Sequence, residues 1–323
     1  MHSAHTRRVQ VGFLETIGLL PFSTRMREAL LALRGDESTP PSRAGLSSLG
    51  IFAPRLGLAT WLGAVRKDRR VPIYNLWNHT QTPPSEGWSV RRTRVQDFRG
   101  GRLTYDSHTG TDFIVPPGTL VAAPAPGVVL RVSSEWNRGG LKVFLDHGRG
   151  LVTTHNHLAR SLVAEGARVE RGAAIAVSGY SGLDALMGFP FGAPHVHMNT
   201  WLAGRSVDPF ARWGQTSLFR VHNAPEPDDG LADDRNFAPT VFCPERVQEG
   251  VDRCIHEETR QALQREERLA CRAMALLFYA NYYPTRFREP PELYEGVFPR
   301  EPRLDLPFFR EDFVGITFER TLG

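Results

Sequence analysis

The middle of the chain constrains the fold most, because short β-branched runs separated by Gly and Pro fill it from about residue 90 to residue 213. Runs of this kind, bounded by turn residues, are typical of β-strands. Two of them, 141–145 and 151–155, are joined by Asp-His-Gly-Arg-Gly, which predicts an antiparallel hairpin. The region is therefore expected to be all β. The other runs lie at 119–123, 128–132, 168–172 and 174–178.

The flanking segments are typical of helices and irregular structure. Apolar residues at helical spacing predict a helix from Ser23, a candidate N-cap, to Arg34, with Gly35 ending it. A second helical pattern predicts one long helix over about 244–283, which Pro284 ends. We therefore expect three parts: an N-terminal extension (1–89), a β domain (90–214) and a C-terminal extension (215–323).

Composition excludes several classes of protein. The 323 residues are 41% hydrophobic and 23% charged, as in an ordinary soluble globular protein. The net charge is +4, and we interpret the basic clusters at 66–70 and 91–94 as solvated surface. No nucleic-acid motif occurs, so nucleic acid is not an expected partner. Three cysteines allow at most one disulfide, for example between Cys243 and Cys254, and the redox compartment stays open.

Targeting signals are also lacking. No stretch has the length needed to span a bilayer. The apolar run 11–20 is interrupted by Glu15 and Thr16, so it is a poor signal peptide. The sequence taken at face value predicts a soluble protein without an integral membrane segment. Delivery to the envelope by a non-standard route, or after removal of a leader, remains open.

Three short phrases hold the side chains suited to a metal centre. They are His108-Thr-Gly-Thr-Asp112, His155-Asn-His157 and His195-Val-His197. Zinc is bound by imidazole nitrogen and carboxylate oxygen, and a catalytic zinc site uses three protein ligands and leaves one position open. The phrases supply such a set and leave histidines over to move protons. They point to a zinc hydrolase.

Local geometry indicates how these phrases converge. Gly110 lets the backbone bend, so that the two ends of the first phrase can reach one ion. Strand residues two apart share a face. The side chains of His195 and His197 are therefore predicted to point the same way. The same rule predicts one shared face for Thr153, His155 and His157.

These residues carry a family resemblance. The stretch from His108 to Pro209, about a third of the chain, resembles the lysostaphin/LytM-type zinc metallopeptidases, which cleave peptide cross-links of bacterial peptidoglycan. The histidine phrases occur in the family's order, with Gly and Pro landmarks between them. Among these landmarks are Pro117-Gly-Thr-Leu-Val-Ala-Ala-Pro124, Asp146-His-Gly, Val177-Ser-Gly-Tyr-Ser-Gly182 and Val207-Asp-Pro209.

The resemblance implies both a fold and a chemistry. The fold is a mainly β catalytic domain, in which antiparallel sheets form an open groove, with α-helical N- and C-terminal extensions. The implied centre is one Zn²⁺ ion held by His108, Asp112 and His197. His157 and His195 are implied to act on the zinc-bound water and the developing oxyanion. The implied reaction is hydrolysis of amide bonds in peptidoglycan stem or cross-bridge peptides, which makes these peptides the expected partner.

The sequence departs from the family at three places. His155 stands where the family usually has a groove-facing Tyr, and both a contact with substrate or oxyanion and a plain rim position stay open for it. The segment 183–193 is longer than the family's tight loop, which predicts a remodelled groove wall. Met198 and Asn199 follow His197 in place of the usual Phe-Glu. These departures bear on substrate identity rather than on the fold.

Other polar side chains are weighed against this site. His147 is interpreted as a turn residue. Asn78 and His79 lie upstream, where some latent relatives provide an inhibitory fourth ligand. The phrase His256-Glu-Glu-Thr-Arg260 resembles the HExxH motif of metalloproteases, but an arginine replaces the second histidine, so a solvated helix face is expected.

Two rival functions stay open. One is a catalytically silent LytM-type module that binds cell wall or a partner hydrolase, although silent members have typically lost ligands and this chain keeps all three. The other is a toxin-like or phage-associated lysin delivered without a leader. The sequence leaves the oligomeric state, the bond that is cut and any inhibition by the flanking regions open.

Overall fold

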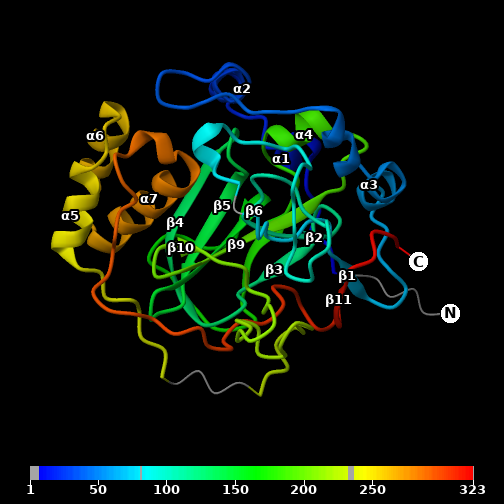
Figure 1. Cartoon of the computed structure of the whole chain (residues 1–323). Coiled ribbons are helices and arrows are strands. Elements are labelled where there is room, and N and C mark those ends of the chain that lie inside the picture. Colours follow the sequence, from blue (N-terminus) through cyan, green and yellow to red (C-terminus); the bar gives the residue numbers. More distant parts are fainter. Residues whose placement is uncertain (1–6, 81, 232–235, 323) are drawn as a thin grey trace.

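An antiparallel sheet forms the centre of the computed structural model, which describes residues 7–80, 82–231 and 236–322 (Figure 1). The strand order is β10–β9–β6–β5–β4–β7, with β2 paired to β9 and β8 paired to both β6 and β3. The strands are β2 (Gly110–Ile114), β3 (Leu120–Ala122), β4 (Gly127–Glu135), β5 (Gly140–Asp146), β6 (Leu151–Ser161), β7 (Arg168–Val169), β8 (Ala174–Ser178), β9 (His195–Leu202) and β10 (Arg205–Ser206). The predicted hairpin is present as the antiparallel β5–β6 pair.

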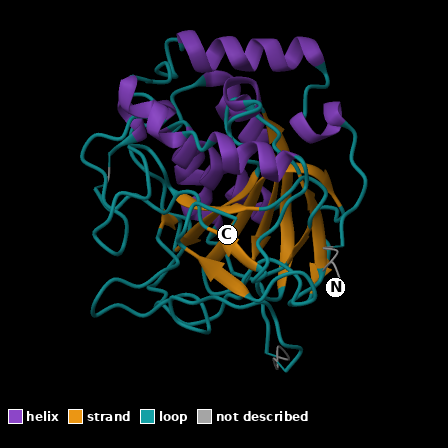
Figure 2. Ribbon diagram, turned by 90° about the vertical axis from the view of Figure 1, so that its right-hand side faces the viewer, coloured by secondary structure: helices purple, strands orange, loops and turns teal. Residues whose placement is uncertain are grey.

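Helices surround part of this sheet, as Figures 1 and 2 show. They are α1 (Phe13–Ile17), α2 (Phe22–Arg34), α3 (Pro54–Trp61), α4 (Leu183–Gly188), α5 (Pro244–Asp252), α6 (Glu257–Arg265) and α7 (Leu269–Tyr282), with 3₁₀ turns η1 (Leu46–Ile51), η2 (Pro84–Glu86) and η3 (Pro284–Arg286). The mainly β fold with helical extensions is thus confirmed. Residues 1–6 of the expected N-terminal extension and 232–235 of the expected C-terminal extension lie outside the described residues.

The predicted helix at 23–34 is present as α2, which begins one residue earlier and has Pro21 at its N-cap. The prediction of one long helix over 244–283 is wrong, because the backbone breaks twice. His256 and Arg268 are both extended, and His256 caps α6 by accepting a hydrogen bond from the Thr259 N–H. The apolar spacing continued across the breaks because α5, α6 and α7 all contribute to one hydrophobic cluster.

The two extensions help to bury the sheet. On one face, strand residues such as Phe113 pack with Ile73 from the N-terminal side and Phe308 from the C-terminal side. Short strands β1 (Arg70–Pro72) and β11 (Gly315–Thr317) pair in parallel and so join the N-terminal and C-terminal extensions. On the other face, Trp201 of β9 packs with Phe278 of α7. The β domain therefore shares its core with both extensions.

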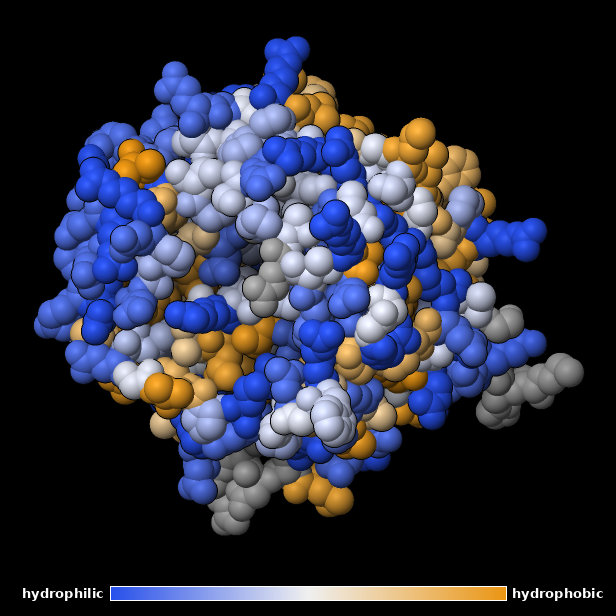
Figure 3. All heavy atoms as spheres, viewed as in Figure 1, coloured by the Kyte–Doolittle hydropathy of each residue, from blue (hydrophilic) through white to orange (hydrophobic). Residues whose placement is uncertain are grey.

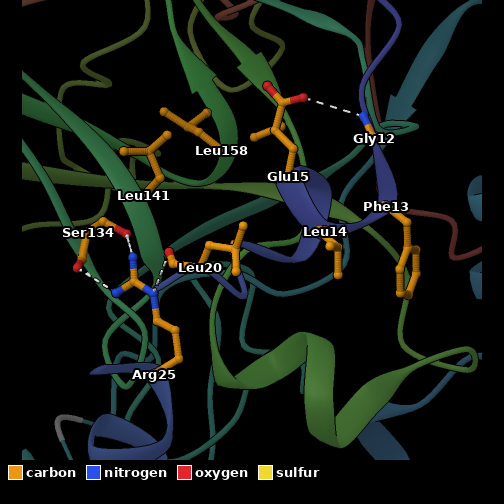
Figure 4. A pocket seen from close by; sticks show the side chains of 11 residues that line it. Gly12, Phe13, Leu14, Glu15, Leu20, Arg25, Ser134, Leu141 and Leu158 are labelled. Atoms are coloured by element: carbon orange, nitrogen blue, oxygen red, sulfur yellow. Dashed lines mark hydrogen bonds between the residues drawn. The ribbon is translucent and has the colours of Figure 1, made fainter. Parts of the chain in front are cut away.

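A hollow of about 800 Å³ lies between α1 and the strands β4–β6. Figure 4 shows Arg25 at its edge, where the guanidinium donates to the carbonyl of Leu20 and to both oxygens of Ser134. Its described lining includes Leu141 and Leu158 but none of the predicted metal ligands. This hollow is therefore not the site of the predicted metal ligands, although Leu158 directly follows His157.

Two other expectations concern helices and thiols. None of the described helices is long and apolar enough to cross a membrane. The three cysteines, all among the described residues, are free, so the disulfide that the sequence allowed is not formed.

Candidate metal centre

Three predicted ligands converge at one edge of the sheet. Asp112 on β2 and His197 on β9 are paired across the two strands, so their side chains lie on the same face. His108 precedes β2 and reaches the same point. Its Nε2 lies 3.0 Å from Asp112 Oδ1 and 3.2 Å from His197 Nδ1, and the last two atoms are 2.7 Å apart. All three residues are buried.

This donor set fits a zinc ion. A zinc ion about 2.0–2.1 Å from each donor in tetrahedral geometry places the donors about 3.3 Å apart. The observed separations, 2.7–3.2 Å, are somewhat shorter than that value. Gly110 is needed for the approach, since a Cβ there would lie 2.5 Å from His197 Nε2. Gly110 lies in the regular strand β2, so it admits the His197 ring rather than bending the backbone as the sequence suggested.

The segment before the β domain holds two of the ligands from outside. His108 Nδ1 donates to the Leu76 carbonyl at 2.7 Å, which leaves the Nε2 lone pair for a metal. The Asn75 side chain donates to Asp112 Oδ2 at 2.7 Å, while Oδ1 faces the two histidines. The backbone of this segment is also hydrogen-bonded to that of β2, because the Asp112 N–H donates to the Asn75 carbonyl. Sequence reasoning missed these partners, since one Asn in an apolar stretch carries no signal.

The charges at the centre suit metal binding. Burial would raise the pKa of Asp112, but the charges of His108 and His195 and the hydrogen bonds it accepts hold it well below its usual value. Asp112 is therefore an anion at neutral pH. Burial lowers the pKa of His197, which keeps that imidazole neutral and able to bind a metal. Burial also lowers the pKa of His108, but Asp112 outweighs it and the net shift is upward.

Asn75→Ala is expected to weaken zinc binding by roughly 10–100-fold, because partners that orient a ligand contribute about that much to metal affinity. The measurement is competition with a chromophoric chelator. Asn78→Ala is the matched control, since Asn78 is equally buried but donates to the Asp106 carbonyl instead. Equal affinity of the Asn75 variant and the wild type would contradict the assigned role.

His157 and His195 lie beside the three predicted ligands. Their rings are 4.7 Å apart, and His195 Nε2 is 3.6 Å from Asp112 Oδ1. Each Nδ1 donates to a backbone carbonyl, that of Ser181 for His157 and that of Ala193 for His195. Both Nε2 atoms are therefore unprotonated in the neutral rings. Burial holds the pKa of His157 well below its usual value, so this ring is neutral at pH 7.

A bulge in β6 brings His157 to this face. The pairing of β5 with β6 shifts in register between Leu141 and Val143, and His157 has a φ of +61°. Positive φ is uncommon for a residue with a side chain. Gly140 on β5 makes room for the arrangement, since a Cβ there would lie 2.3 Å from the Ser181 oxygen that holds His157.

The expectation that His155 and His157 share a face is wrong. His155 pairs with Met198 and Val143, whose side chains lie in the hydrophobic core, whereas Asn156 pairs with His197. The bulge then reverses the alternation, so His157 joins the site and His155 does not. His155 is fully buried, and its Nε2 lies 3.4 Å from Thr153 Oγ1. The groove-facing position inferred from the family Tyr does not apply here.

Burial lowers the pKa of His155, and that of His147, to about 3. In the unfolded chain their pKa is near 6.5. Each histidine therefore stabilises the fold fully above about pH 6.5, and that contribution is lost as the pH falls toward 3. The loss is about 1.4 kcal/mol per pH unit for each group.

We therefore expect His155→Gln to recover about 2 kcal/mol of the unfolding free energy that the wild type loses between pH 6.5 and pH 5. Urea unfolding at the two pH values measures this. The exposed His222 gives the control, as His222→Asn removes a histidine that is not buried. An unchanged slope in the His155 variant would mean that this ring is not neutral in the folded protein.

The remaining candidates lie elsewhere. His79 Nε2 is 2.7 Å from Asp208 Oδ2, and Asn78 donates to a backbone carbonyl, so neither completes the metal cluster here. His147 is a buried turn residue that bonds Pro126 and Thr153. His256 is a helix N-cap, as described above.

The part of the chain that holds these residues resembles known proteins. Residues 106–209 match the sequence profile described as peptidase family M23. This segment belongs to peptidase family M23. The profile begins two residues before His108 and ends just after Asp208, so the M23 domain contains every predicted site residue. It lies within the β domain expected at 90–214 and leaves both extensions outside it.

The chain is similar to several known proteins over about a third of its length. It is 40% identical over 102 residues to an uncharacterized metalloprotease of Haemophilus influenzae, covering 32% of this chain and 20% of that protein. It is 35% identical over 101 residues to the peptidoglycan DD-endopeptidase ShyA of Vibrio cholerae, covering 31% and 22%. The solved catalytic domain of lysostaphin from Staphylococcus simulans is 27% identical, with a TM-score of 0.28, covering 32% of this chain and 75% of that one. The match thus spans about a fifth of either curated relative.

Proposed function

We propose that this protein is a zinc-dependent endopeptidase that hydrolyses amide bonds in peptidoglycan stem or cross-bridge peptides. The observation that carries the proposal is the convergence of His108 Nε2, Asp112 Oδ1 and His197 Nδ1, with the longest separation 3.2 Å. Family membership supports the reaction class, and the DD-endopeptidase relative supports the substrate class.

The ligands and the two further histidines divide the work. Zinc, when bound, supplies a Lewis acid that activates water and polarises the scissile carbonyl. His157 presents an unprotonated Nε2 that can take a proton from the attacking water. Once protonated, the same atom can pass that proton to the leaving amine. His195 presents a second Nε2 on the same side, where it can donate a hydrogen bond to the developing oxyanion after taking up a proton from solvent.

Access to the site is narrow. The exposed fractions of His157, His195 and His197 are 5%, 6% and 7%, whereas His108 and Asp112 are 1% and 2% exposed. The substrate must therefore approach from the side of the two proton-handling histidines. The segment that carries Leu76 and Asn75 covers the opposite side of the centre.

Digestion of purified muropeptides, followed by mass spectrometry, tests the proposal. Cleavage of a peptide amide bond, loss of cleavage with a chelator and its return with zinc are the expected results. No cleavage by a protein that holds stoichiometric zinc would overturn the proposal. Binding of the same protein to cell walls would then favour the catalytically silent module.

A further inference from the structure

The longer segment between Ser181 and His195 forms a wall beside His157 and His195. It contains α4, whose first residue donates its N–H to the Trp136 carbonyl. At its far end, Trp61 of α3 donates from its indole to the Gly192 carbonyl at 3.2 Å. The Trp61 ring also packs against Phe189, with ring centroids 5.1 Å apart. The remodelled wall is therefore anchored at both ends.

This wall adds a carboxylate to the mouth of the site. Asp184, in the first turn of α4, places Oδ2 3.7 Å from His157 Nε2. The Asp184 side chain is 50% exposed, whereas that of His157 is 6% exposed. Burial against the site raises the pKa of the Asp184 carboxyl, although half of the side chain remains exposed to solvent. Among the described residues, no Lys or Arg side chain forms an ion pair with Asp184.

Aromatic rings continue the wall outward from the same point. Tyr180 lies 6.1 Å from the His157 ring and 5.6 Å from the Trp61 ring. Phe189 and Phe13 extend the row, 5.5 Å apart and about half exposed. Figure 3 shows hydrophobic residues gathered at the upper right, over α3 and α4. Aromatic faces attract cations as well as apolar groups, so they add to the attraction of a carboxylate for an ammonium group.

We infer that Asp184 and the neighbouring aromatic rings form a subsite for a primary ammonium group of the substrate, next to the scissile amide. The inference rests on the proposed function and adds a preference to it. The carboxylate attracts an ammonium group and repels a carboxylate at the same position. It comes from a segment that is longer than the family's loop, so the preference belongs to this chain.

Matched peptides test the subsite. The probes are alanine-rich pentapeptides built around the bond that is cut in muropeptides, with lysine or ε-acetyl-lysine beside it, and a second pair with a free or acetylated N-terminus. The two pairs distinguish a side-chain amine from an α-amine. In one of the two pairs, we expect kcat/KM of the zinc-loaded wild type to be about tenfold higher for the free-amine peptide than for its acetylated partner, as one well-placed ion pair allows.

Asp184→Asn should bring this ratio close to one, and Asp184→Lys should favour acetylated peptides. The ratio cancels any general effect on His157, because both peptides of a pair use the same histidine. Glu311→Gln, which removes an exposed carboxylate of the C-terminal extension, should keep the wild-type ratio.

Binding of the same probes separates this inference from the proposed function. An active enzyme whose ratio is unchanged in Asp184→Asn would overturn the subsite alone. A protein that cuts nothing, but binds amine peptides about tenfold better than Asp184→Asn does, would overturn the endopeptidase and leave the subsite. If Asp184→Lys kept the wild-type preference for amine peptides in both cleavage and binding, that result would also contradict the subsite.

Discussion

Replacing His197 by alanine is expected to remove zinc from the protein and to lower kcat/KM on muropeptides on the order of 10⁴-fold. The metal contributes several kcal/mol of stabilisation to the transition state, and each 1.4 kcal/mol corresponds to about a factor of ten in rate. His197 Nδ1 is 2.7 Å from Asp112 Oδ1 and 3.2 Å from His108 Nε2, so no other described side chain takes its place. Elemental analysis and muropeptide digestion measure the two effects.

His155→Gln is the matched control for this loss. His155 lies on the neighbouring strand β6 but on the opposite face of the sheet, so its replacement should keep stoichiometric zinc and activity within a few-fold of the wild type. Circular dichroism checks that both variants are folded. Full activity of His197→Ala would refute the assigned centre, and loss of zinc in His155→Gln would show that the two faces are not independent.

The convergence of His108, Asp112 and His197 was expected from the family resemblance, and local geometry explains it. Asp112 and His197 come from strands, and the Gly110 position between two ligands fixes how closely β2 and β9 approach. The structure brings together the residues that the family resemblance singled out. Their roles stay predictions until the variants are measured.

The side of the sheet on which His155 lies was not predictable from alternation alone. A bulge inserts one residue into β6, and every side chain beyond it changes face. The hydrophobic spacing of residues 244–283 failed for a related reason. The periodicity shows only which residues are buried. Three short helices that pack on one hydrophobic cluster have the same spacing of buried residues as one long helix.

Sequence patterns also could not predict the hydrogen-bond partners of the predicted ligands. Asn75 and Leu76 lie more than 30 positions before Asp112 and outside the M23 match, and only the pairing of their backbone with β2 brings them to the centre. Asp184 belongs to a segment whose length was informative, but its contact with His157 depends on where α4 is anchored.

His157→Ala and His195→Ala are each expected to lower kcat by roughly 10²–10⁴-fold while the zinc content and KM stay close to wild type. Neither ring belongs to the ligand cluster, and each is held by its own backbone carbonyl, so removal of one leaves the metal site intact. Steady-state kinetics with metal analysis of the same samples measures this. A variant that loses zinc along with activity would assign its histidine to the metal instead.

The double variant decides whether the two histidines serve one step. Their rings are 4.7 Å apart, which lets both act on the same water and carbonyl. If they do, the second substitution should lower kcat much less in the double variant than it does as a single substitution, because the effects of groups that act as a unit are not additive. If the two losses multiply, each histidine acts independently, one on the proton of the water and the other on the oxyanion. Either variant with kcat within a few-fold of wild type would remove its histidine from the chemistry.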